Sequence, residues 1–482
     1  MSENQPNNYQ DKTESDVITS LIDEFSNPEL EEEEFRNDFF KGFSGRRKKS
    51  AFSLGLIWMI TVGLHWLSWS WIVISVIAVF ITFHGFRLIL SNPNPNKQNL
   101  SSAEIETGAI TPKVSLLVSA KNEEPVIAKL VAMLSQLNYP QDKYEYWVIN
   151  DNSSDRTGII LDELTQQYPQ LKVLHRDNTA KGGKSGALNQ VLPMTDGDIV
   201  GVFDADAIVD PDLLNKITPL FNDSQLGAIQ VRKAISNSED NFWTRGQSAE
   251  MALDSYFQQQ RIACGGIGEL RGNGQFVSRK ALESCGGWNE ETITDDLDLT
   301  IRLHLDNWNI GVLTHPAVQE EGVKKAIALW HQRSRWAEGG YQRYLDYWRF
   351  ILSDRLNWKK KFDLFYFFLI QYIFPTAAIP DLLTSIVNRD LPLIAPLTTI
   401  SIGIGLWGMF GGLKRTQSQE KLTFTQQLSL FIKSLFGMAY MTHWFLVMPF
   451  TTFRMSIRQK RLKWVKTVHE GSAEQLMNSQ SS

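Results

Sequence analysis

A run of about 40 apolar residues most constrains what this chain can fold into. Residues 51–90 contain a single formal charge, Arg87, and Ser68-Trp-Ser70 interrupts the run halfway. Because a helix spans a bilayer with about 20 apolar residues, the run is long enough to cross one twice. We therefore predict a transmembrane helical hairpin over residues 51–90, with arms at 51–67 and 71–90. The alternative is a pair of buried helices in a soluble domain.

The flanks of this hairpin predict its orientation. Four basic residues, Arg46-Arg-Lys-Lys49, precede the first arm. Positively charged flanks stay in the cytoplasm, so we expect both ends of the hairpin to lie there. Residues 1–44 are acidic and polar without helical or strand periodicity, which predicts a disordered tail. The apolar run begins too late in the chain for a cleavable signal peptide.

Composition limits the class of protein. The chain has 482 residues, enough for two or three domains, and a net charge of -5 that gives no support to nucleic-acid binding. Its two cysteines, Cys264 and Cys285, lack metal-ligand spacing. We therefore expect reduced thiols rather than a disulfide or a metal site.

Residues 110–330 have a different pattern. Short apolar runs alternate with helical patterns, which predicts βαβ units and a mainly parallel sheet. No Gly-x-Gly-x-x-Gly follows the first run, which argues against a dinucleotide-binding oxidoreductase. We therefore predict a cytoplasmic α/β domain inserted between membrane segments. The expected strands are 114–118, 146–149, 172–174, 199–203 and 228–231, and the expected helices include 126–137, 157–168 and 241–264.

The predicted strand 199–203 ends in two carboxylates, Asp204 and Asp206. Residues i and i+2 of an extended segment point the same way, so these carboxylates repel each other unless a cation lies between them. Mg2+ takes oxygen ligands and shares its shell with substrate phosphates. The position suits a ligand, because open α/β sheets bind ligands beyond the carboxyl ends of their strands. A lone Asp-x-Asp is more often a solvated turn, so the other motifs decide its interpretation.

Polar loops follow other predicted strands at the same edge of the sheet. Glu123 and Asp151 could accept hydrogen bonds from a base or a ribose. Residues 181–186 form a glycine-rich loop with two lysines, Lys181 and Lys184, whose backbone could approach a diphosphate closely. This loop lacks the Walker spacing. Together these residues favour a nucleotide-sugar site over a dinucleotide site.

Two further segments carry candidate catalytic groups. Arg271-Gly-Asn-Gly-Gln-Phe276 is a tight loop where backbone could approach a substrate. Asp295, Asp296 and Asp298 lie at the start of a predicted helix, and one of them could act as a general base. Carboxylates at a helix start are often simple caps, but three in four residues exceed what capping needs.

A third segment, 330–336, places Gln332, Arg335 and Trp336 on one face of a helix, at i, i+3 and i+4. An amide, a guanidinium and an indole together could hold a departing diphosphate and a ring. Interfacial amphipathic helices, which we predict over 331–361, explain the same residues, and both interpretations can hold. An aromatic stripe that we expect at the membrane interface follows at Tyr341, Tyr344, Tyr347 and Trp348.

The chain becomes apolar again from residue 362. We predict a C-terminal transmembrane region over 362–452, with spans at 362–387 and 392–413. A last apolar stretch, 429–452, is interrupted by polar residues and a proline. The region therefore holds two or three spans.

Charge argues against counting the last stretch as a span. With the N-terminal hairpin it would make five spans, and the basic residues 454–463 would then lie outside. That placement contradicts the positive-inside rule. We therefore predict four spans, a last stretch that is re-entrant or partly interfacial, and a basic cytoplasmic tail over 453–482.

Four motifs follow one another along the chain: Asp151, Asp204-Ala-Asp206, Thr294-Asp-Asp296 and Gln332-Arg-Ser-Arg-Trp336. In this order they resemble the motifs of family 2 glycosyltransferases of the membrane-embedded, processive-type branch, as in cellulose and hyaluronan synthases. The resemblance implies a GT-A-like, nucleotide-sugar-binding fold. Two departures are Asn150, where the family often has a second aspartate, and Asp295, where glutamate is usual.

Over residues 46–469 the chain also resembles a narrower family, the cyanobacterial β-monoglucosyldiacylglycerol synthases. The blocks 182–193, 265–275, 286–299 and 328–348 carry this resemblance. It implies an inverting transfer of glucose from UDP-glucose to the 3-hydroxyl of 1,2-diacylglycerol, with Mg2+ as cofactor and a β-linked membrane glycolipid as product. It further implies a multi-pass protein of the plasma or thylakoid membrane.

The resemblance also implies roles for single residues. Asp204 and Asp206 would hold Mg2+ and the donor diphosphate, and Asp296 would be the general base on the acceptor hydroxyl. The remaining donor contacts would be Glu123 and Asp151 at the uridine, with Lys184, Gln332, Arg335 and Trp336, and the acceptor side would be Gly272, Asn273 and Asp295. Trp464, Lys466 and Thr467 lie where related enzymes have a gating loop, although a basic membrane-facing tail explains them equally well.

Two other functions compete with this one. A polysaccharide synthase that extends and exports a β-glucan needs enough helices for a channel, and four or five spans make that harder. A non-catalytic membrane protein that binds a nucleotide sugar would be expected to lack some of the carboxylates or the Gln-Arg-Trp set. All of them are present.

Overall fold

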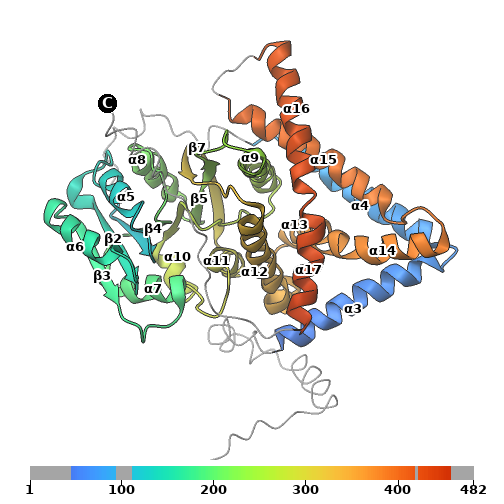
Figure 1. Cartoon of the computed structure of the whole chain (residues 1–482), viewed down its shortest axis with the longest axis horizontal. Helices are drawn as coiled ribbons and strands as arrows, with labels where there is room; N and C mark the ends of the chain where they lie inside the picture. The colour runs from blue at the N-terminus through green and yellow to red at the C-terminus, as the bar shows by residue number, and fades with distance from the viewer. Residues whose placement is uncertain (1–44, 94–110, 418–421, 458–482) are drawn as a thin grey trace, which may run out of the picture. The chain divides into compact units, whose positions relative to one another are not determined.

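A computed structural model describes residues 45–93, 111–417 and 422–457 (Figure 1). Both cysteines are free thiols, as predicted. Several predictions concern residues outside the described ranges, namely the acidic tail (1–44), most of the basic tail (453–482) and the suggested gating residues Trp464, Lys466 and Thr467.

The α/β domain is built on a seven-stranded sheet with the order β3-β2-β1-β4-β6-β5-β7. Neighbouring strands are parallel except at β6, which runs antiparallel to β4 and to β5. The predicted α/β fold with a mainly parallel sheet is therefore confirmed. The strands are β1 (Val114–Ala120), β2 (Tyr144–Asp151), β3 (Leu171–Arg176), β4 (Ile199–Phe203), β5 (Leu226–Ile235), β6 (Gln275–Ser278) and β7 (Asn309–Glu320).

Hydrophobic cores on both faces of the sheet hold the central strands. All five residues of β4 are buried, as expected for a strand that helices cover on both sides. Leu116 belongs to the core on the side of α5, α6 and α8, and Leu117 to the core on the side of α7, α10 and α11. These helices are α5 (Ile127–Leu134), α6 (Thr157–Gln167), α7 (Gly183–Val191), α8 (Leu213–Ile217), α10 (Arg279–Ser284) and α11 (Asp295–Leu305).

Two strands, β6 and β7, were not predicted from the sequence. β6 is four residues long and begins inside the segment 271–276, where glycines predict a loop. β7 contains Pro316, and a proline inside an apolar run argues against a strand. β7 tolerates this proline because it is the edge strand and Pro316 lies in a bulge, between Leu313, which pairs with Val231 of β5, and Val318, which pairs with Lys233.

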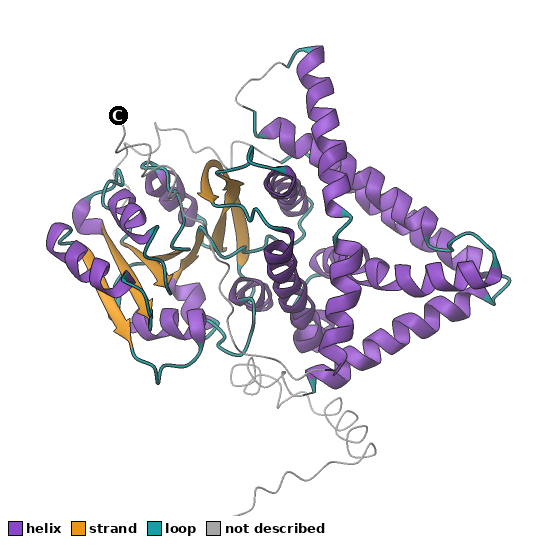
Figure 2. Cartoon of the chain, in the orientation of Figure 1, coloured by secondary structure: helices purple, strands orange, loops and turns teal. Residues whose placement is uncertain are grey.

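Apolar helices precede and follow the α/β domain in the chain. Figure 2 shows an all-helical part of the molecule (purple) beside the part that holds the strands (orange). By length and hydropathy, four described segments could cross a membrane: Ser70–Leu90, Trp358–Asn388, Ala395–Arg415 and Phe424–Ile457. The predicted first arm, 51–67, is helical, but its helix begins with four basic residues and is not among these four. The helices are α3 (Arg46–His65), α4 (Ser70–Leu90), α13 (Trp358–Phe368), the π-helical turn η7 (Leu369–Ile373), α14 (Phe374–Asn388), α15 (Ala395–Arg415), α16 (Phe424–Met441) and α17 (Trp444–Ile457).

A 27-residue helix, α12 (Ala326–Leu352), lies where the sequence predicts interfacial helices. The prediction of an interfacial aromatic stripe on it is wrong for three of the four residues. Tyr341, Tyr344 and Tyr347 are only 1%, 8% and 2% exposed, whereas Trp348 is 38% exposed. The tyrosines are buried because the first two pack against Phe368 and the third donates a hydrogen bond to Asp298 Oδ1 at 2.9 Å.

Glycines bring the apolar helices close to α9 (Phe242–Ala263), a long helix of the α/β domain. A Cβ on Gly246 of α9 would lie 2.2 Å from the ring of Tyr440 in α16. A Cβ on Gly412 of α15 would lie 2.2 Å from the carbonyl oxygen of Ala252 in α9. Larger residues would push these helices apart, so the glycines fix the apolar helices against the α/β domain.

A buried ion network joins the same parts of the molecule. The carboxylate of Glu269 lies 3.2 Å from Arg261, 2.6 Å from Arg271 and 3.0 Å from Arg343. Burial alone would raise the pKa of Glu269, but these three guanidinium groups hold it well below its usual range. Arg261 also pairs with Asp363 of α13 at 2.9 Å, so the network reaches from the α/β domain into the apolar helices.

Candidate active site

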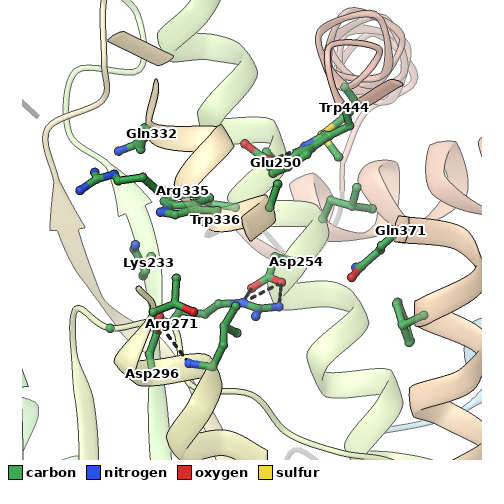
Figure 3. Close-up of a pocket in the computed structure, with 18 of the residues that line it drawn as sticks. Lys233, Glu250, Asp254, Arg271, Asp296, Gln332, Arg335, Trp336, Gln371 and Trp444 are labelled. Carbon is green, nitrogen blue, oxygen red and sulfur yellow. Dashed lines mark hydrogen bonds and ion pairs between the residues drawn. The ribbon is translucent and has the colours of Figure 1, made fainter. Parts of the chain in front are cut away.

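One cavity of about 530 Å³ begins at the carboxyl ends of β1, β2 and β4 and extends between the apolar helices (Figure 3). The structure brings almost all of the predicted site residues to its wall. They are Glu123, Asp151, Lys184, Asp204, Asp206, Gly272, Asp295, Asp296, Gln332, Arg335 and Trp336.

Asn273 is the predicted site residue that does not line the cavity. It is fully buried, and its amide oxygen accepts a hydrogen bond from the backbone N–H of Asp204 at 3.2 Å. Its amide nitrogen donates to Glu320 Oε2 at 3.3 Å. Asn273 therefore fixes the loop after β4 against β7 instead of facing the cavity.

The two carboxylates after β4 are held by different contacts. Asp204 Oδ1 accepts a hydrogen bond from Lys184 Nζ at 2.6 Å, and Asp206 Oδ2 accepts one from the backbone N–H of Glu321 at 3.2 Å. Both side chains line the cavity. The lysine offsets the negative charge that the strand end creates.

Lys184 occupies the first turn of α7, where Gly182 has a φ of +82° and forms the N-cap. This positive φ is where glycine is favoured over other residues. Burial alone would lower the pKa of Lys184, but the carboxylates of Asp204 and Asp295 raise it above its usual value. The lysine is therefore a fixed positive charge in the cavity.

A residue that our sequence analysis missed connects this loop to β2. Arg176, at the end of β3, pairs with Asp151 Oδ1 at 2.5 Å and donates to the carbonyl oxygen of Gly183 at 3.0 Å. Parallel pairing of β2 and β3 places Asp151 beside Arg176. Both strands were predicted from the sequence. Arg176 could not be identified as the partner of Asp151, because that pairing depends on the register between the two strands.

Glu123 lies on the loop after β1 and is only 8% exposed. Its backbone N–H donates to Thr157 Oγ1, at the start of α6, at 2.8 Å. The loops after β1 and β2 are therefore tied together, which brings Glu123 and Asp151 to one end of the cavity.

The carboxylates at the start of α11 separate into two groups. Asp295 and Asp296 line the cavity, whereas Asp298 is buried and pairs with Arg302 of the same helix at 2.7 Å. Two of the three predicted candidates therefore face the cavity, and the third stabilises the helix. Asp298 is held away from the cavity by hydrogen bonds from Asn289 and Tyr347, each at 2.9 Å, as well as by Arg302.

Burial and mutual repulsion shift the pKa values of these two groups. The pKa of Asp296 rises to about 6 because it is buried and because Asp295 lies beside it. Burial likewise raises the pKa of Asp295, and its Oδ2 atom is buried without a hydrogen-bond partner among the described residues. A carboxylate with a pKa near 6 is suited to accept a proton at neutral pH.

Glycine leaves space next to Asp296. Gly272 has a φ of +80°, and a Cβ there would lie 3.4 Å from Asp296 Oδ2. The loop backbone can therefore approach the carboxylate while leaving room for a substrate group.

The face of α12 that was predicted to bind a substrate lies over the charged end of the cavity. Figure 3 shows Gln332, Arg335 and Trp336 on one side of it, with Lys233 below them. The indole of Trp336 stacks on the guanidinium of Arg333 at 3.9 Å and lies 5.5 Å from Lys233 Nζ. Burial lowers the pKa of Arg335, against the opposing effect of Asp204.

Lys233 is a cavity residue that our sequence analysis did not identify. It extends from β5 and pairs with Glu320 of β7 at 2.9 Å. Alternation along β5 could have pointed to it, but β7, which supplies its partner, was not predicted. With Lys184 and Arg335 it makes the charged end of the cavity rich in cations.

The carboxylates after β4 fit a divalent cation. Asp204 and Asp206 offer hard oxygen ligands on one side of a strand end. In the part of the chain that the structure describes, no group of three or more His, Cys, Asp or Glu side chains could hold a metal ion. A cation bound here would therefore need substrate phosphate oxygens to complete its shell.

The other end of the cavity is apolar. Its walls come from α9, α11, α13, η7, α14, α15 and the junction of α16 and α17. The lining side chains include Leu253, Phe257, Leu297, Phe367, Ile370, Phe374, Ile402, Met438, Met441, Phe445 and Met448. Such walls fit hydrocarbon chains, and the polar end fits an anionic, hydrogen-bonding ligand.

Comparisons with known proteins agree with this geometry. Residues 112–339 match a family described as glycosyltransferase like family 2. The chain is 55% identical over 467 residues to a β-monoglucosyldiacylglycerol synthase from Synechocystis sp., covering 96% of this chain and 97% of that protein. It is 54% identical over 462 residues to a protein of the same name from Trichormus variabilis, with 96% and 97% covered.

Among solved structures, the chain is similar to a mannosyltransferase from Pyrobaculum calidifontis in complex with GDP-Man and Mn2+. The TM-score is 0.51 at 19% identity, covering 80% of this chain and 98% of that one. This similarity shows a shared fold and supports the predicted GT-A-like architecture.

Proposed function

This chain belongs to family 2 of the glycosyltransferases and, within it, to the β-monoglucosyldiacylglycerol synthases, and from this membership we propose its reaction. The enzyme transfers glucose from UDP-glucose to the 3-hydroxyl of 1,2-diacylglycerol and makes β-monoglucosyldiacylglycerol. One observation supports a lipid acceptor beyond the names of the relatives. The charged end with Asp296 and the apolar end between the helices belong to a single cavity.

Asp296 acts as the general base of the reaction. Its carboxylate takes the proton of the acceptor hydroxyl while that oxygen forms a bond to the anomeric carbon of glucose. The bond from the anomeric carbon to the diphosphate oxygen breaks, and UDP leaves with the electron pair. Attack on the face opposite the leaving group converts an α-linked donor into a β-linked product. A positioned base contributes on the order of 10²–10⁴-fold.

Cations at the charged end stabilise the departing UDP. Lys184 and Arg335 lie where negative charge develops on the diphosphate, and fixed cations often contribute most to the acceleration of such a reaction. Asp204 and Asp206 would hold Mg2+, which when bound would neutralise part of the diphosphate charge. Lys184 also contacts Asp204, so it keeps that carboxylate in place.

The remaining side chains orient the two substrates. Glu123 and Asp151, tied together beyond β1 and β2, contact the uridine. Gln332 and Trp336 contact the donor from α12. Gly272 and Asp295 form the acceptor side, where the buried Oδ2 atom of Asp295 can accept a hydrogen bond. The buried Asn273 supports this site by fixing the loop of Asp204.

A glucan synthase is less consistent with this cavity. A growing glucan is rich in hydroxyl groups, and it would have to pass through the apolar end to leave the site. That end is lined mainly by hydrocarbon side chains. We therefore retain diacylglycerol, rather than a glucan, as the proposed acceptor.

The contacts of the apolar helices support a membrane topology with four crossings. Four segments, namely α3, α4, α13 with α14, and α15, each have one end against the α/β domain. Away from the domain, His65 of α3 pairs with Asp381 of α14 at 2.8 Å, and the backbone N–H of Leu393, just before α15, donates to the same carboxylate at 2.9 Å. The contacts at the domain end are Arg46–Asp346, Arg87–Cys264, Lys360–Asn309 and Arg415–Gln259.

The last two helices both contact the α/β domain, and α17 also packs against α3 and α14. Trp444 donates to Glu250 of α9 at 2.9 Å, and Arg454 pairs with Glu338 of α12 at 2.6 Å. Both ends of α17 therefore touch the domain, so we infer that this helix stays on the domain side, although composition alone would allow Phe424–Ile457 to span a membrane. The α/β domain and the chain after Arg454 then lie on the cytoplasmic side, as the positive-inside rule requires.

Protease protection of a C-terminal tag tests this topology. In sealed, right-side-out vesicles the tag stays intact, while a cleavage site inserted after Arg389, between α14 and α15, is cut. A tag that is cut from outside would contradict the four-crossing topology.

The reaction is tested with purified full-length protein in detergent, Mg2+, labelled UDP-glucose and dioleoylglycerol. We expect one labelled glycolipid with a β linkage. Asp296→Asn lowers its formation by roughly 10²–10⁴-fold, since the base is lost. Asp162→Asn, at a carboxylate of α6 that is 69% exposed, is the matched control and retains activity. A long labelled polymer would favour the glucan synthase instead. Transfer of label neither to dioleoylglycerol nor to a glucan chain would refute the proposed reaction.

A further inference from the structure

A proline explains an irregular turn beside the apolar end of the cavity. η7 interrupts the helical run between α13 and α14, and Pro375 follows it. Proline has no N–H to donate to the carbonyl oxygen of Gln371, four residues earlier, and its ring crowds that carbonyl. The helix accommodates this with a π-helical turn, a feature that is frequent at functional sites.

Gln371 is the polar side chain of this turn, among Leu369, Ile370, Tyr372 and Ile373. It lines the cavity and is exposed to it. Figure 3 shows it on the wall opposite Asp254 and Arg271, with its amide directed into the space between the walls. Gln371 therefore lies where the polar and apolar parts of the cavity meet.

The described residues offer no hydrogen-bond partner to the Gln371 amide. Across the cavity, the Asp254 carboxylate is already paired with Arg271 at 2.6 Å. When lipid chains fill the cavity and exclude water from it, a polar amide in its wall costs free energy unless the ligand bonds to it. A ligand that carries a hydrogen-bond acceptor next to its hydrocarbon chains would satisfy it.

We propose that Gln371 is a specificity residue for the acceptor lipid, donating a hydrogen bond from its side-chain amide to an ester carbonyl. This inference rests on the proposed function. In a diacylglycerol, the ester groups lie between the reacting hydroxyl and the acyl chains. With the hydroxyl at Asp296 and the chains between the apolar helices, the esters fall at the boundary where Gln371 lies.

A pair of acceptors tests the hydrogen bond. Dioleoylglycerol carries two ester carbonyls, and the dioleyl ether of glycerol has the same hydroxyl and chains without them. The wild-type enzyme is expected to use the ester lipid about tenfold better in kcat/KM, as one hydrogen bond that the bound lipid shields from water predicts. Equal use of the two lipids by the wild-type enzyme would overturn the inference.

Variants at Gln371 complete the test. Gln371→Met keeps the length of the side chain without a donor, and it is expected to lose the ester preference by raising KM for the ester lipid alone. Gln371→Asn keeps a donor and should retain part of the preference. The KM for UDP-glucose should be unchanged in both. A similar loss with both lipids would instead indicate a structural role and overturn the inference.

The proposed function and this inference fail in different ways. A wild-type enzyme that glucosylates neither lipid overturns the proposed function. An active wild-type enzyme whose Gln371→Met variant keeps the ester preference overturns the inference alone.

Discussion

The two ends of the cavity are built in different ways. At the charged end, side chains come from strand ends and helix starts, and short polar contacts fix them, such as Lys184 on Asp204 at 2.6 Å. At the apolar end, side chains from several helices meet mostly by packing. Packed apolar walls tolerate exchanges of similar volume, whereas a charge that loses its partner is costly. We therefore expect the charged end to respond to changes of single atoms and the apolar end to changes of volume.

The largest effect is expected where the two ends are joined, at Glu269. Glu269→Gln leaves the buried Arg261 and Arg343, with the half-buried Arg271 beside them, without their shared carboxylate. Breaking a buried pair in this way costs about 3–5 kcal/mol in the free energy of unfolding. Thermal unfolding in detergent measures this loss.

The matched control for that variant is Glu283→Gln. Glu283 is 59% exposed and lies 3.7 Å from Arg279, so its loss should change stability by less than about 1 kcal/mol. Equal effects of the two substitutions would show that the network does not hold the two ends together.

The charged end should be sensitive to Asp204→Asn. This change removes one charge that would bind the cation and that also positions Lys184. We expect kcat to fall on the order of 10²–10³-fold, with a weaker response to added Mg2+. Asp210→Asn, also beyond β4 but outside the cavity lining, is the control. An unchanged Mg2+ dependence in Asp204→Asn would place the cation elsewhere.

The charged end could largely be predicted from the sequence, because its residues follow strands or begin helices at recognisable spacings. Asp204, Asp206 and Asp296 all reach the cavity wall. What the sequence could not provide is the register between strands. Arg176 and Lys233 were missed because their partners lie on neighbouring strands, at positions that only the assembled sheet defines.

The apolar end could not be predicted in the same way. Hydropathy identifies apolar helices but does not say which faces meet, so the tyrosines of α12 were predicted at an interface and are buried. The contribution of Gln371 was also invisible, because a single glutamine in an apolar segment has no motif. In the fold, β7 was not predicted because a proline argues against a strand. An edge strand can nevertheless contain one.

The pH dependence of the reaction tests the charged end further, because Asp296 lies there. With a pKa of about 6, Asp296 is mostly deprotonated at pH 7.5 and mostly protonated at pH 5. If Asp296 is the base, as we propose, its basic form is lost as pH falls, and kcat/KM for the acceptor should be about tenfold lower at pH 5 than on its plateau. Burial and Asp295 raise this pKa, while Arg271 and Lys184 oppose them.

Measuring kcat/KM from pH 5 to pH 8 shows directly how far kcat/KM falls on the acid side of the pH profile. Binding of UDP, which does not need the base, serves as the control over the same range. A flat profile for kcat/KM would argue against Asp296 as the base.

The smallest expected effect is at the apolar end, where a larger side chain should change the preferred acyl chain. Ile402 of α15 lines the cavity, and Ile402→Trp would take space from the hydrocarbon chains. Excluding one methylene costs ~0.8 kcal/mol, or about fourfold in relative kcat/KM, in favour of shorter chains. Competition between dioleoylglycerol and dimyristoylglycerol measures the shift. Ile379→Trp, on α14 but outside the cavity lining, is the matched control, and an equal shift in both variants would mean that the acyl chains lie elsewhere.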